Sequence, residues 1–273
     1  MRIVKAESDD SEDLIGITLA GRFLLEHKIS DGGSGAVWLG RDLENQRLAV
    51  AVKLIRSSGP NSNPRWQTEL KALEKLNHPG IVQPRSGGVS ETLGPYLVTE
   101  YVEGITLQTV LARGAVPHQW VLSRVWELCD ALEYAHGRGV LHCDLKPNNI
   151  MIRHYGDAGA CAVLIDFGVA VLRDGDHSTT VYQNAEGALD YMAPEQLEGK
   201  LSNATDIYAL AAIVFEALTG ARWRQAQRDG RWEAALGEMP YLVPLFRTAL
   251  DVNPKLRYGS VAAFREAFRA GWE

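Results

Sequence analysis

HCDLKPNNI, residues 142–150, is the most informative stretch of this chain. It contains a histidine, an aspartate, a lysine and two asparagines within nine residues. It is too polar for a core strand, and its ends are too apolar for a free loop. Its only acid, Asp144, directly follows a cysteine, Cys143. The stretch is therefore a candidate for a chemical role centred on Asp144, and Cys143 raises the question of how that role is controlled.

The composition is typical of a soluble globular protein. The 273 residues are 46% hydrophobic and 23% charged, which suits one large domain or two lobes. The net charge of −6 argues against a general nucleic-acid binder. Three scattered cysteines without a CxxC pair indicate a reducing compartment, and neither a disulfide framework nor a zinc site.

The sequence predicts neither a signal peptide nor a transmembrane helix. The acidic N-terminus lacks the apolar region of a signal peptide. The longest apolar run, 207–218, includes Glu216 and is too short to span a bilayer. We therefore expect a cytoplasmic protein whose given segment makes no membrane contact.

The first part of the chain, from about residue 19 to 103, is rich in strand patterns. Runs of Val, Ile and Leu punctuated by Gly and Asp predict strands at 23–29, 36–40 and 48–55. One helix, 64–78, interrupts them, with leucines at helical spacing. Residues 1–18 precede this part and are predicted to form a flexible tail.

Helices dominate from about residue 104 to 273. Residues 118–136 carry an amphipathic stripe, whereas 205–220 are apolar nearly all round and are predicted to form a buried central helix that Gly220 ends. The chain is thus expected to be a tail followed by one two-lobed unit.

Two features of the strand-rich part each allow a chemical and a structural interpretation, and the residues alone do not decide between them. ISDGGSGAVWLG, 29–40, could approach a phosphate closely or could form a plain hairpin. Lys53 lies within an apolar strand, and Glu69 lies on the inner face of the predicted helix. The two could form an ion pair, or each could reach solvent by itself.

A third feature, LIDFGVA at 164–170, reads as a buried strand that ends in Asp166. Its carboxylate could bind a divalent metal together with the amide oxygen of Asn149, since Mg²⁺ prefers such ligands. Alternatively, Asp166 only caps a turn.

The order of these features is more informative than any one of them. A glycine-rich loop, a strand lysine, a helix glutamate, HCDLKPNN and Asp-Phe-Gly follow one another, and MAPE at 192–195 completes the series. With this set the chain resembles the eukaryotic-type protein kinases, and the bacterial serine/threonine kinases in particular. The resemblance runs from about Gly21 to about Phe268. It implies an α+β, bilobal protein-kinase fold over 19–273, with a small β-rich N-lobe that holds one key helix and a larger helical C-lobe.

The resemblance implies ATP and Mg²⁺ as cofactors, with Mn²⁺ as an alternative metal. Asp144 would accept the proton of the substrate hydroxyl, and Lys146 would steady the γ-phosphate. Lys53 would hold the α and β phosphates, and an ion pair with Glu69 would fix its position. The metal ligands would be Asn149 and Asp166.

Further roles follow from the same resemblance. The residues around the nucleotide would be Ile29, Gly32, Gly33, Gly35, Val37, Ala51, Thr99, Glu100, Val102 and Met151. Glu195 would form a buried clamp with Arg257, and Asp206 would brace the catalytic loop. His142 and Phe167 would pack in an internal spine.

Three positions depart from the family pattern. Ser30 replaces the first glycine of the loop, and Ala188 replaces a threonine before YMAPE. Cys143 replaces an arginine that in many members binds a phosphate on the activation segment, a bidentate contact that cysteine cannot make. The potential phosphosites of that segment are Ser178, Thr179 and Thr180. We hypothesise that activity does not need their phosphorylation, or that a regulatory protein partner controls it.

Three function classes follow. The first is an active kinase that phosphorylates Ser/Thr hydroxyls of protein substrates. The second, supported by the three departures, is a pseudokinase or nucleotide-binding regulatory scaffold. The third, a small-molecule kinase, ranks last because the chain has the DFG-to-MAPE pattern and Arg257. The sequence does not indicate an oligomeric state.

Overall fold

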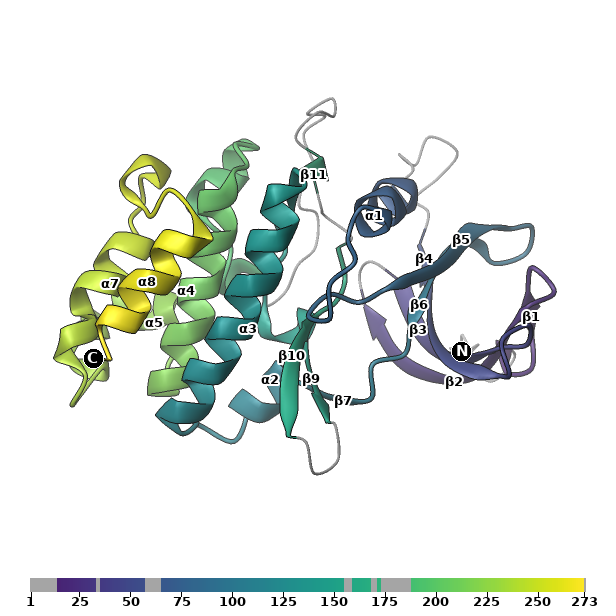
Figure 1. Cartoon of the computed structure of the whole chain (residues 1–273), viewed down its shortest axis with the longest axis horizontal. Helices are drawn as coiled ribbons and strands as arrows, with labels where there is room; N and C mark the ends of the chain where they lie inside the picture. Colours follow the sequence, from purple (N-terminus) through teal and green to yellow (C-terminus); the bar gives the residue numbers. More distant parts are fainter. Residues whose placement is uncertain are drawn as a thin grey trace, which may run out of the picture. The chain divides into compact units, whose positions relative to one another are not determined.

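The computed structural model describes residues 14–32, 35–56, 65–154, 159–167, 171–172 and 188–272. The described residues form two compact units. The first comprises those up to Trp66 and Pro84–Tyr101, and the second comprises Gln67–Gln83 and those from Val102 onward. The first is built of strands and the second mainly of helices (Figure 1), which matches the predicted α+β class.

The first unit is a six-stranded antiparallel sheet with the strand order β1-β2-β3-β4-β6-β5. Figure 1 shows its strongly curved strands. The strands are β1 (Thr18–Leu19), β2 (Phe23–Gly32), β3 (Gly35–Asp42), β4 (Leu48–Ile55), β5 (Pro84–Ser90) and β6 (Gly94–Glu100). The three predicted strands thus correspond to β2, β3 and β4.

Alternation along these strands creates the core of the first unit. In β4, Val50 and Val52 are buried, whereas Ala51 and Lys53 between them are half-buried. Trp38 of β3 lies opposite Val52 and is also buried. Since successive side chains of a strand point to opposite faces, one face of the sheet carries the core and the other is less covered.

Folded contacts begin before residue 19, earlier than the sequence suggests. The Gly16 amide donates to the Leu25 carbonyl, and Thr18 pairs with Leu24. Leu14 packs against the buried core of the sheet. The apolar residues of this short stretch therefore have a partner in β2, which an inspection of the stretch by itself does not reveal.

Gly35 has a conformation and a neighbour that exclude a side chain. Its φ is +141°, and an added Cβ would lie 2.0 Å from the Leu54 carbonyl oxygen. We expect Gly35→Ala to destabilise the protein by about 1–3 kcal/mol, as measured by urea unfolding. Gly32→Ala is the matched control, because nothing lies within 4 Å of a Cβ there. Equal stability of the two variants would contradict this prediction.

The second unit consists mainly of helices. They are α1 (Arg65–Glu74), α2 (Leu107–Leu111), α3 (His118–Gly137), α4 (Asn203–Thr219), α5 (Trp223–Arg228), α6 (Trp232–Ala235), α7 (Val243–Ala249) and α8 (Val261–Ala270). The first residues of α1 belong to the first unit. The long helices α3 and α4 pack against each other, and α8 contacts both (Figure 1).

Helix α4 is the central element of this unit, as its apolar sequence predicts. Every residue from Thr205 to Leu218 is buried. The helix ends at Gly220, whose φ of +71° is a left-handed conformation that glycine adopts easily. A helix without a solvated face can carry polar side chains only where neighbouring segments supply their partners.

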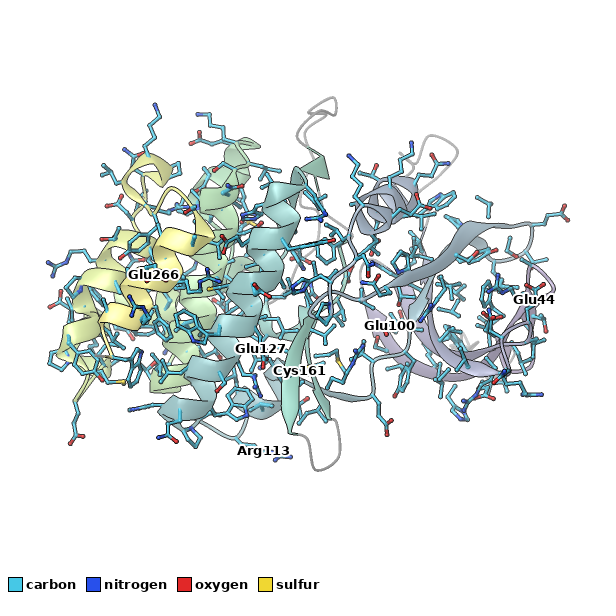
Figure 2. The ribbon with its side chains drawn as sticks, viewed as in Figure 1. Glu44, Glu100, Arg113, Glu127, Cys161 and Glu266 are labelled. Atoms are coloured by element: carbon cyan, nitrogen blue, oxygen red, sulfur yellow. The ribbon has the colours of Figure 1, made fainter. Side chains whose placement is uncertain are left out.

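Short strands border the helices. The three-stranded sheet β10-β9-β7 contains β7 (Gly104–Thr106), β9 (Ile150–His154) and β10 (Ala160–Leu164), and a two-stranded sheet pairs β8 (Val140–Leu141) with β11 (Val171–Leu172). Glu127 of α3 accepts a 2.7 Å hydrogen bond from the Ala162 amide. Figure 2 labels Glu127 and Cys161, the residue before Ala162. This bond fastens β10 to α3.

No helix in the described part of the chain has both the length and the apolarity needed to cross a membrane.

Candidate active site

The segment between β8 and β9 brings three predicted site residues together. The Asp144 carboxylate accepts hydrogen bonds from Lys146 Nζ at 2.7 Å and from Asn149 Nδ2 at 3.0 Å. Asn149 Nδ2 also donates to the Asp144 carbonyl at 2.8 Å. The Asp144 side chain is 18% exposed. The carboxylate is thus held in one orientation and is still accessible.

Asp206 of α4 fixes the backbone just before Asp144. Its Oδ1 accepts the Cys143 amide at 2.8 Å, and its Oδ2 accepts the His142 amide at 2.9 Å and lies 2.8 Å from His136 Nε2. Burial acts to raise the pKa of Asp206, but the hydrogen bond from His136, the electrostatic interaction with His136 and His142, and the hydrogen bond from the His142 amide lower it below its ordinary value. The carboxylate therefore remains ionised and braces the loop.

Cys143 occupies a strained position. Its φ of +60° is left-handed, which costs a non-glycine residue on the order of 1–2 kcal/mol. The Asp206 carboxylate holds its amide, and Gln196 Nε2 donates to its carbonyl at 2.8 Å. Its side chain is buried. Both of these hydrogen bonds use the backbone of Cys143, which they hold in place beside Asp144.

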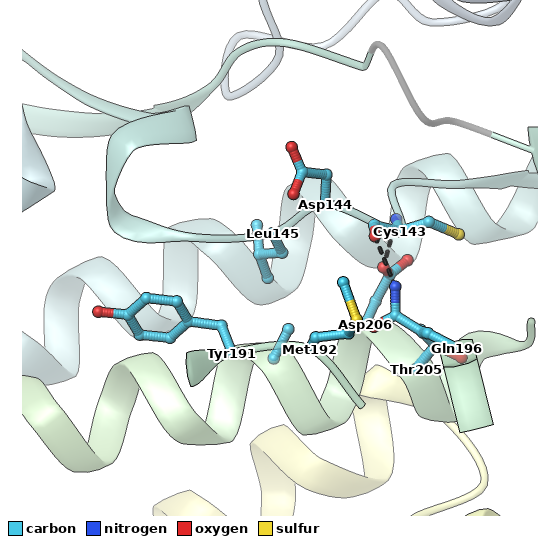
Figure 3. Close-up of a pocket in the computed structure, with 9 residues that line it drawn as sticks. Cys143, Asp144, Leu145, Tyr191, Met192, Gln196, Thr205 and Asp206 are labelled. Atoms are coloured by element: carbon cyan, nitrogen blue, oxygen red, sulfur yellow. Dashed lines mark hydrogen bonds between the residues drawn. The ribbon is translucent and has the colours of Figure 1, made fainter. Parts of the chain in front are cut away.

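A small cavity lies beneath this loop (Figure 3). Asp144, Tyr191, Gln196 and Asp206 are among its lining residues, and about 10 Å³ is open to the centre of a water molecule. This is enough for about one water and not for a substrate.

The Asp-Phe-Gly stretch reaches the same loop. The Ile165 amide donates to the Asn149 carbonyl at 2.9 Å, so that Asp166 follows directly after this contact. Asp166 has a φ of +58°. Phe167 is buried, and its ring centroid lies 4.5 Å from that of His142. The structure thus brings together the two spine residues that the family resemblance implies.

Asn149 and Asp166, the predicted metal ligands, both carry hard oxygen donors of the kind Mg²⁺ takes. Among the described residues, the two hydrogen bonds that the Asn149 side chain makes use Nδ2, and Oδ1 is the atom suited to a cation. The described residues contain no group of three or more His, Cys, Asp or Glu that could hold a metal. A two-donor site nevertheless fits Mg²⁺, because this ion keeps waters and substrate phosphates as its other ligands.

Four predicted nucleotide contacts share one face of the sheet in the first unit. Val37 lies opposite Lys53 in the β3–β4 pairing, and Ala51 lies opposite Thr99 in the β4–β6 pairing. Opposed residues and alternate residues on a strand point to the same face. All four are half-buried, on the face opposite to the one that carries Trp38 and the core.

Two residues at the end of β2, Asp31 and Gly32, accept hydrogen bonds from an arginine that the sequence patterns did not indicate. Arg56 donates to the Gly32 carbonyl at 2.8 Å and to Asp31 at 2.5 Å. Ile29 of β2 is 50% exposed. Gly33 lies outside the described residues.

The remaining predicted contacts are distributed over both units. Glu100, which Figure 2 labels, ends β6 in the first unit, while the buried Val102 and the half-buried Met151 of β9 belong to the second. Lys53 belongs to the first unit, and Glu69 is buried on α1 in the second. Their ion pair stays a prediction. Ser178, Thr179 and Thr180 lie outside the described residues.

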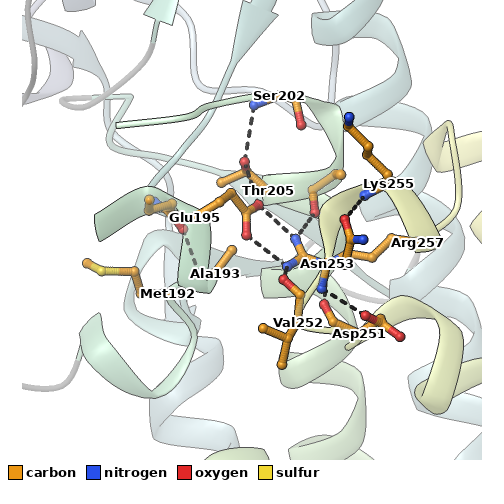
Figure 4. Close-up of polar contacts among 12 residues, drawn as sticks. Met192, Ala193, Glu195, Ser202, Thr205, Asp251, Val252, Asn253, Lys255 and Arg257 are labelled. Atoms are coloured by element: carbon orange, nitrogen blue, oxygen red, sulfur yellow. Dashed lines mark hydrogen bonds and ion pairs between the residues drawn. The ribbon is translucent and has the colours of Figure 1, made fainter. Parts of the chain in front are cut away.

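Glu195 and Arg257 form a buried, bidentate ion pair (Figure 4). Arg257 Nη1 and Nη2 each lie 2.8 Å from one Glu195 oxygen. Thr205 also donates to Glu195, and Arg257 donates to the Asp251 and Ala204 carbonyls. The pair thus joins η5 (Pro194–Glu198), the start of α4 and the loop before α8.

Two polar residues of the site were not anticipated. His136 is the last residue of the predicted helix 118–136, and Gln196 directly follows MAPE. Both are buried in the structure. The only signal for Gln196 was its place next to a motif, and no local signal pointed from His136 to Asp206.

Comparisons with known proteins agree with this geometry. Residues 23–258 match the family model described as Protein kinase domain. The chain is 34% identical to the serine/threonine-protein kinase PknA of Mycobacterium tuberculosis, over 94% of this chain and 62% of PknA. It is 32% identical to the serine/threonine-protein kinase pkn3 of Myxococcus xanthus, over 77% of this chain and 40% of pkn3.

A solved structure is similar as well. The PknI kinase domain of Mycobacterium tuberculosis has a TM-score of 0.76 and 25% identity, over 95% of this chain and 98% of that one. The chain therefore corresponds to nearly all of this solved domain, but to only about 62% of the length of PknA.

Proposed function

This chain belongs to the protein kinase family, and on that premise we propose that it transfers the γ-phosphate of ATP to Ser or Thr hydroxyls of protein substrates. The family implies the use of ATP and a divalent metal. The observation that carries the proposal is the group formed by Asp144, Lys146 and Asn149, in which two donors orient one accessible carboxylate. Such positioning supplies most of the catalysis in phosphoryl transfer.

Each residue of this group has a proposed task. Asp144 takes the proton of the attacking hydroxyl, and Lys146 offers its positive charge to the transferred phosphoryl group. Asn149 and Asp166 hold the metal, which is Mg²⁺ or, as an alternative, Mn²⁺. When bound, the metal neutralises phosphate charge that the chain's own cations leave uncompensated.

The nucleotide is proposed to lie against the less covered face of the sheet in the first unit. Val37 and Ala51 offer it apolar surface, and Lys53 offers a cation that Glu69 orients. Gly32, Gly33 and Gly35 approach the phosphates. The other proposed contacts with the nucleotide are Ile29, Thr99, Glu100, Val102 and Met151.

Transfer of label from γ-labelled ATP in the presence of Mg²⁺ tests the proposal. A generic basic protein serves as the acceptor, and hydrolysis of the product identifies the labelled amino acid. We expect phosphoserine or phosphothreonine. Tight ATP binding without transfer to the acceptor or to the chain itself would contradict the proposal and favour a nucleotide-binding scaffold.

The potential phosphosites give a second prediction. The variant with Ala at Ser178, Thr179 and Thr180 is expected to stay within about threefold of the wild-type rate, because Cys143 cannot bind a phosphate. Initial rates with the same acceptor measure this. Loss of activity that acidic substitutions at the three positions restore would contradict it.

The proposed partners are protein substrates, with a regulatory protein partner as an additional proposal. We also propose a cytoplasmic location for this segment and no binding of nucleic acid, in keeping with its net charge of −6.

A further inference from the structure

The segment Asp190–Gln196, here the 190–196 segment, is fastened by two arginines that follow α4. Arg222 Nη1 lies 2.5 Å from Asp190 Oδ2. Arg224 donates from Nη2 to the Met192 carbonyl at 2.6 Å. Both arginines belong to the ARWRQ stretch, 221–225, directly after the central helix. The proposed function leaves the arginines of this stretch unexplained. Their contacts with Asp190 and Met192 show that they bind the 190–196 segment.

Helix α4 itself contributes another bond to the segment. Tyr191 donates its hydroxyl to the Glu216 carboxylate, and both residues are buried. Burial raises the pKa of both groups. Arg222 Nε lies 3.9 Å from Glu216, so that one guanidinium faces two carboxylates.

The opposite side of the segment is joined to the loop of Asp144. Gln196 donates to the Cys143 carbonyl and accepts the Ala193 amide through Oε1, both at 2.8 Å. Gln196 is 4% exposed. The 190–196 segment is therefore joined to the Asp144 loop by Gln196 and to the stretch after α4 by Arg222 and Arg224.

We propose that Arg222 and Arg224 are positioning residues that order the 190–196 segment for protein substrates in place of a phosphorylated side chain. This inference rests on the proposed function. It adds that Arg222 and Arg224 order the segment, a task for which Cys143 cannot bind a phosphate. Arginine suits the task, because its several donors can satisfy carbonyls and carboxylates at fixed angles. Asp190 and the Met192 carbonyl bracket Tyr191, so that fixing both fixes the chain between them.

Arg224→Met tests the proposal, because it keeps an apolar stem and removes the donors. We expect the KM for a protein acceptor to rise about tenfold, since a charged hydrogen bond is lost, while the KM for ATP stays within about twofold. Amide exchange of peptides that cover 190–196 should accelerate by a similar factor. Arg224→Lys should recover part of both effects, because its ammonium keeps one donor for the carbonyl.

Two further variants complete the experiment. Arg228→Met changes an exposed arginine of α5 and should behave as the wild type. Arg222→Met removes the ion pair with Asp190, and because Arg222 is 46% exposed, this variant should fold. We expect faster amide exchange of the 190–196 peptides in this variant too, which keeps the inference testable if Arg224→Met does not fold.

The outcomes separate this inference from the proposed function. Wild-type exchange rates in Arg222→Met, and also in Arg224→Met wherever that variant folds, would overturn the inference, whatever the activity. A wild-type protein that transfers no phosphate, although the variants accelerate exchange, would overturn the proposed function and leave the ordering role of the arginines in place. A rise in both KM values together would indicate a general structural defect and would also count against the positioning role.

Discussion

Asp144→Asn is expected to lower the rate of phosphate transfer by about 10²–10⁴-fold, the typical contribution of a general base. The amide oxygen of Asn can still accept the hydrogen bonds from Lys146 and Asn149, so the loop should keep its shape. The amide cannot take a proton from the substrate hydroxyl. The measurement is single-turnover transfer from labelled ATP, with binding of a fluorescent ATP analogue measured in parallel.

Nucleotide affinity should change by less than about threefold, because the substitution removes a proton acceptor and leaves the proposed ATP contacts untouched. Asp229→Asn is the matched control, since Asp229 is exposed at the end of α5. A transfer rate in Asp144→Asn close to that of the control would show that Asp144 is not the base. A large loss of ATP binding would instead point to a defect in the fold.

Arg257→Met is expected to reduce the free energy of unfolding by about 3–5 kcal/mol, the typical cost of removing one partner of a buried ion pair. The Arg257 and Glu195 side chains are 0% and 6% exposed. Without the guanidinium, the hydrogen bond from Thr205 is the one that the Glu195 carboxylate would keep among the residues that the structure describes. Urea unfolding followed by tryptophan fluorescence measures the change.

Arg247→Met is the matched control for this prediction. Arg247 lies 2.7 Å from Glu233, but the two side chains are 67% and 52% exposed. Exposed pairs contribute about 0–1 kcal/mol, so the control should unfold nearly as the wild type does. The double variant Glu195→Gln with Arg257→Met should recover part of the loss, because it removes the uncompensated charge. Similar losses of unfolding free energy in Arg257→Met and Arg247→Met would contradict the prediction.

Much of the local structure could be predicted from short sequence patterns. The match to a protein kinase model over 23–258 confirms the predicted family, and the three strands and three helices that the patterns indicated are all present. Helix α4 is the clearest case, because a run of apolar residues without a polar face has to be buried. The group formed by Asp144, Lys146 and Asn149 lies within six consecutive residues, so its assembly depends mainly on one loop.

The supporting contacts could not be predicted in this way. Nothing near His136 indicates that it meets Asp206, and nothing near Arg224 points to the Met192 carbonyl. Leu14 lies within the predicted flexible tail, yet it packs against a core that later strands form. In each case the deciding partner is remote in sequence, and local periodicity carries no information about it.

The sequence by itself determined the family, the strand and helix patterns, and the residues that carry the proposed chemistry. Only the tertiary structure decided which further residues support the Asp144 loop: His136 reaches Asp206 across 70 residues, and Gln196 reaches the Cys143 carbonyl across 53. Amphipathic periodicity and turn chemistry depend on neighbouring residues, so a sequence displays them directly. A buried polar contact depends on which helices pack together, and only the folded chain brings its two partners within hydrogen-bonding distance.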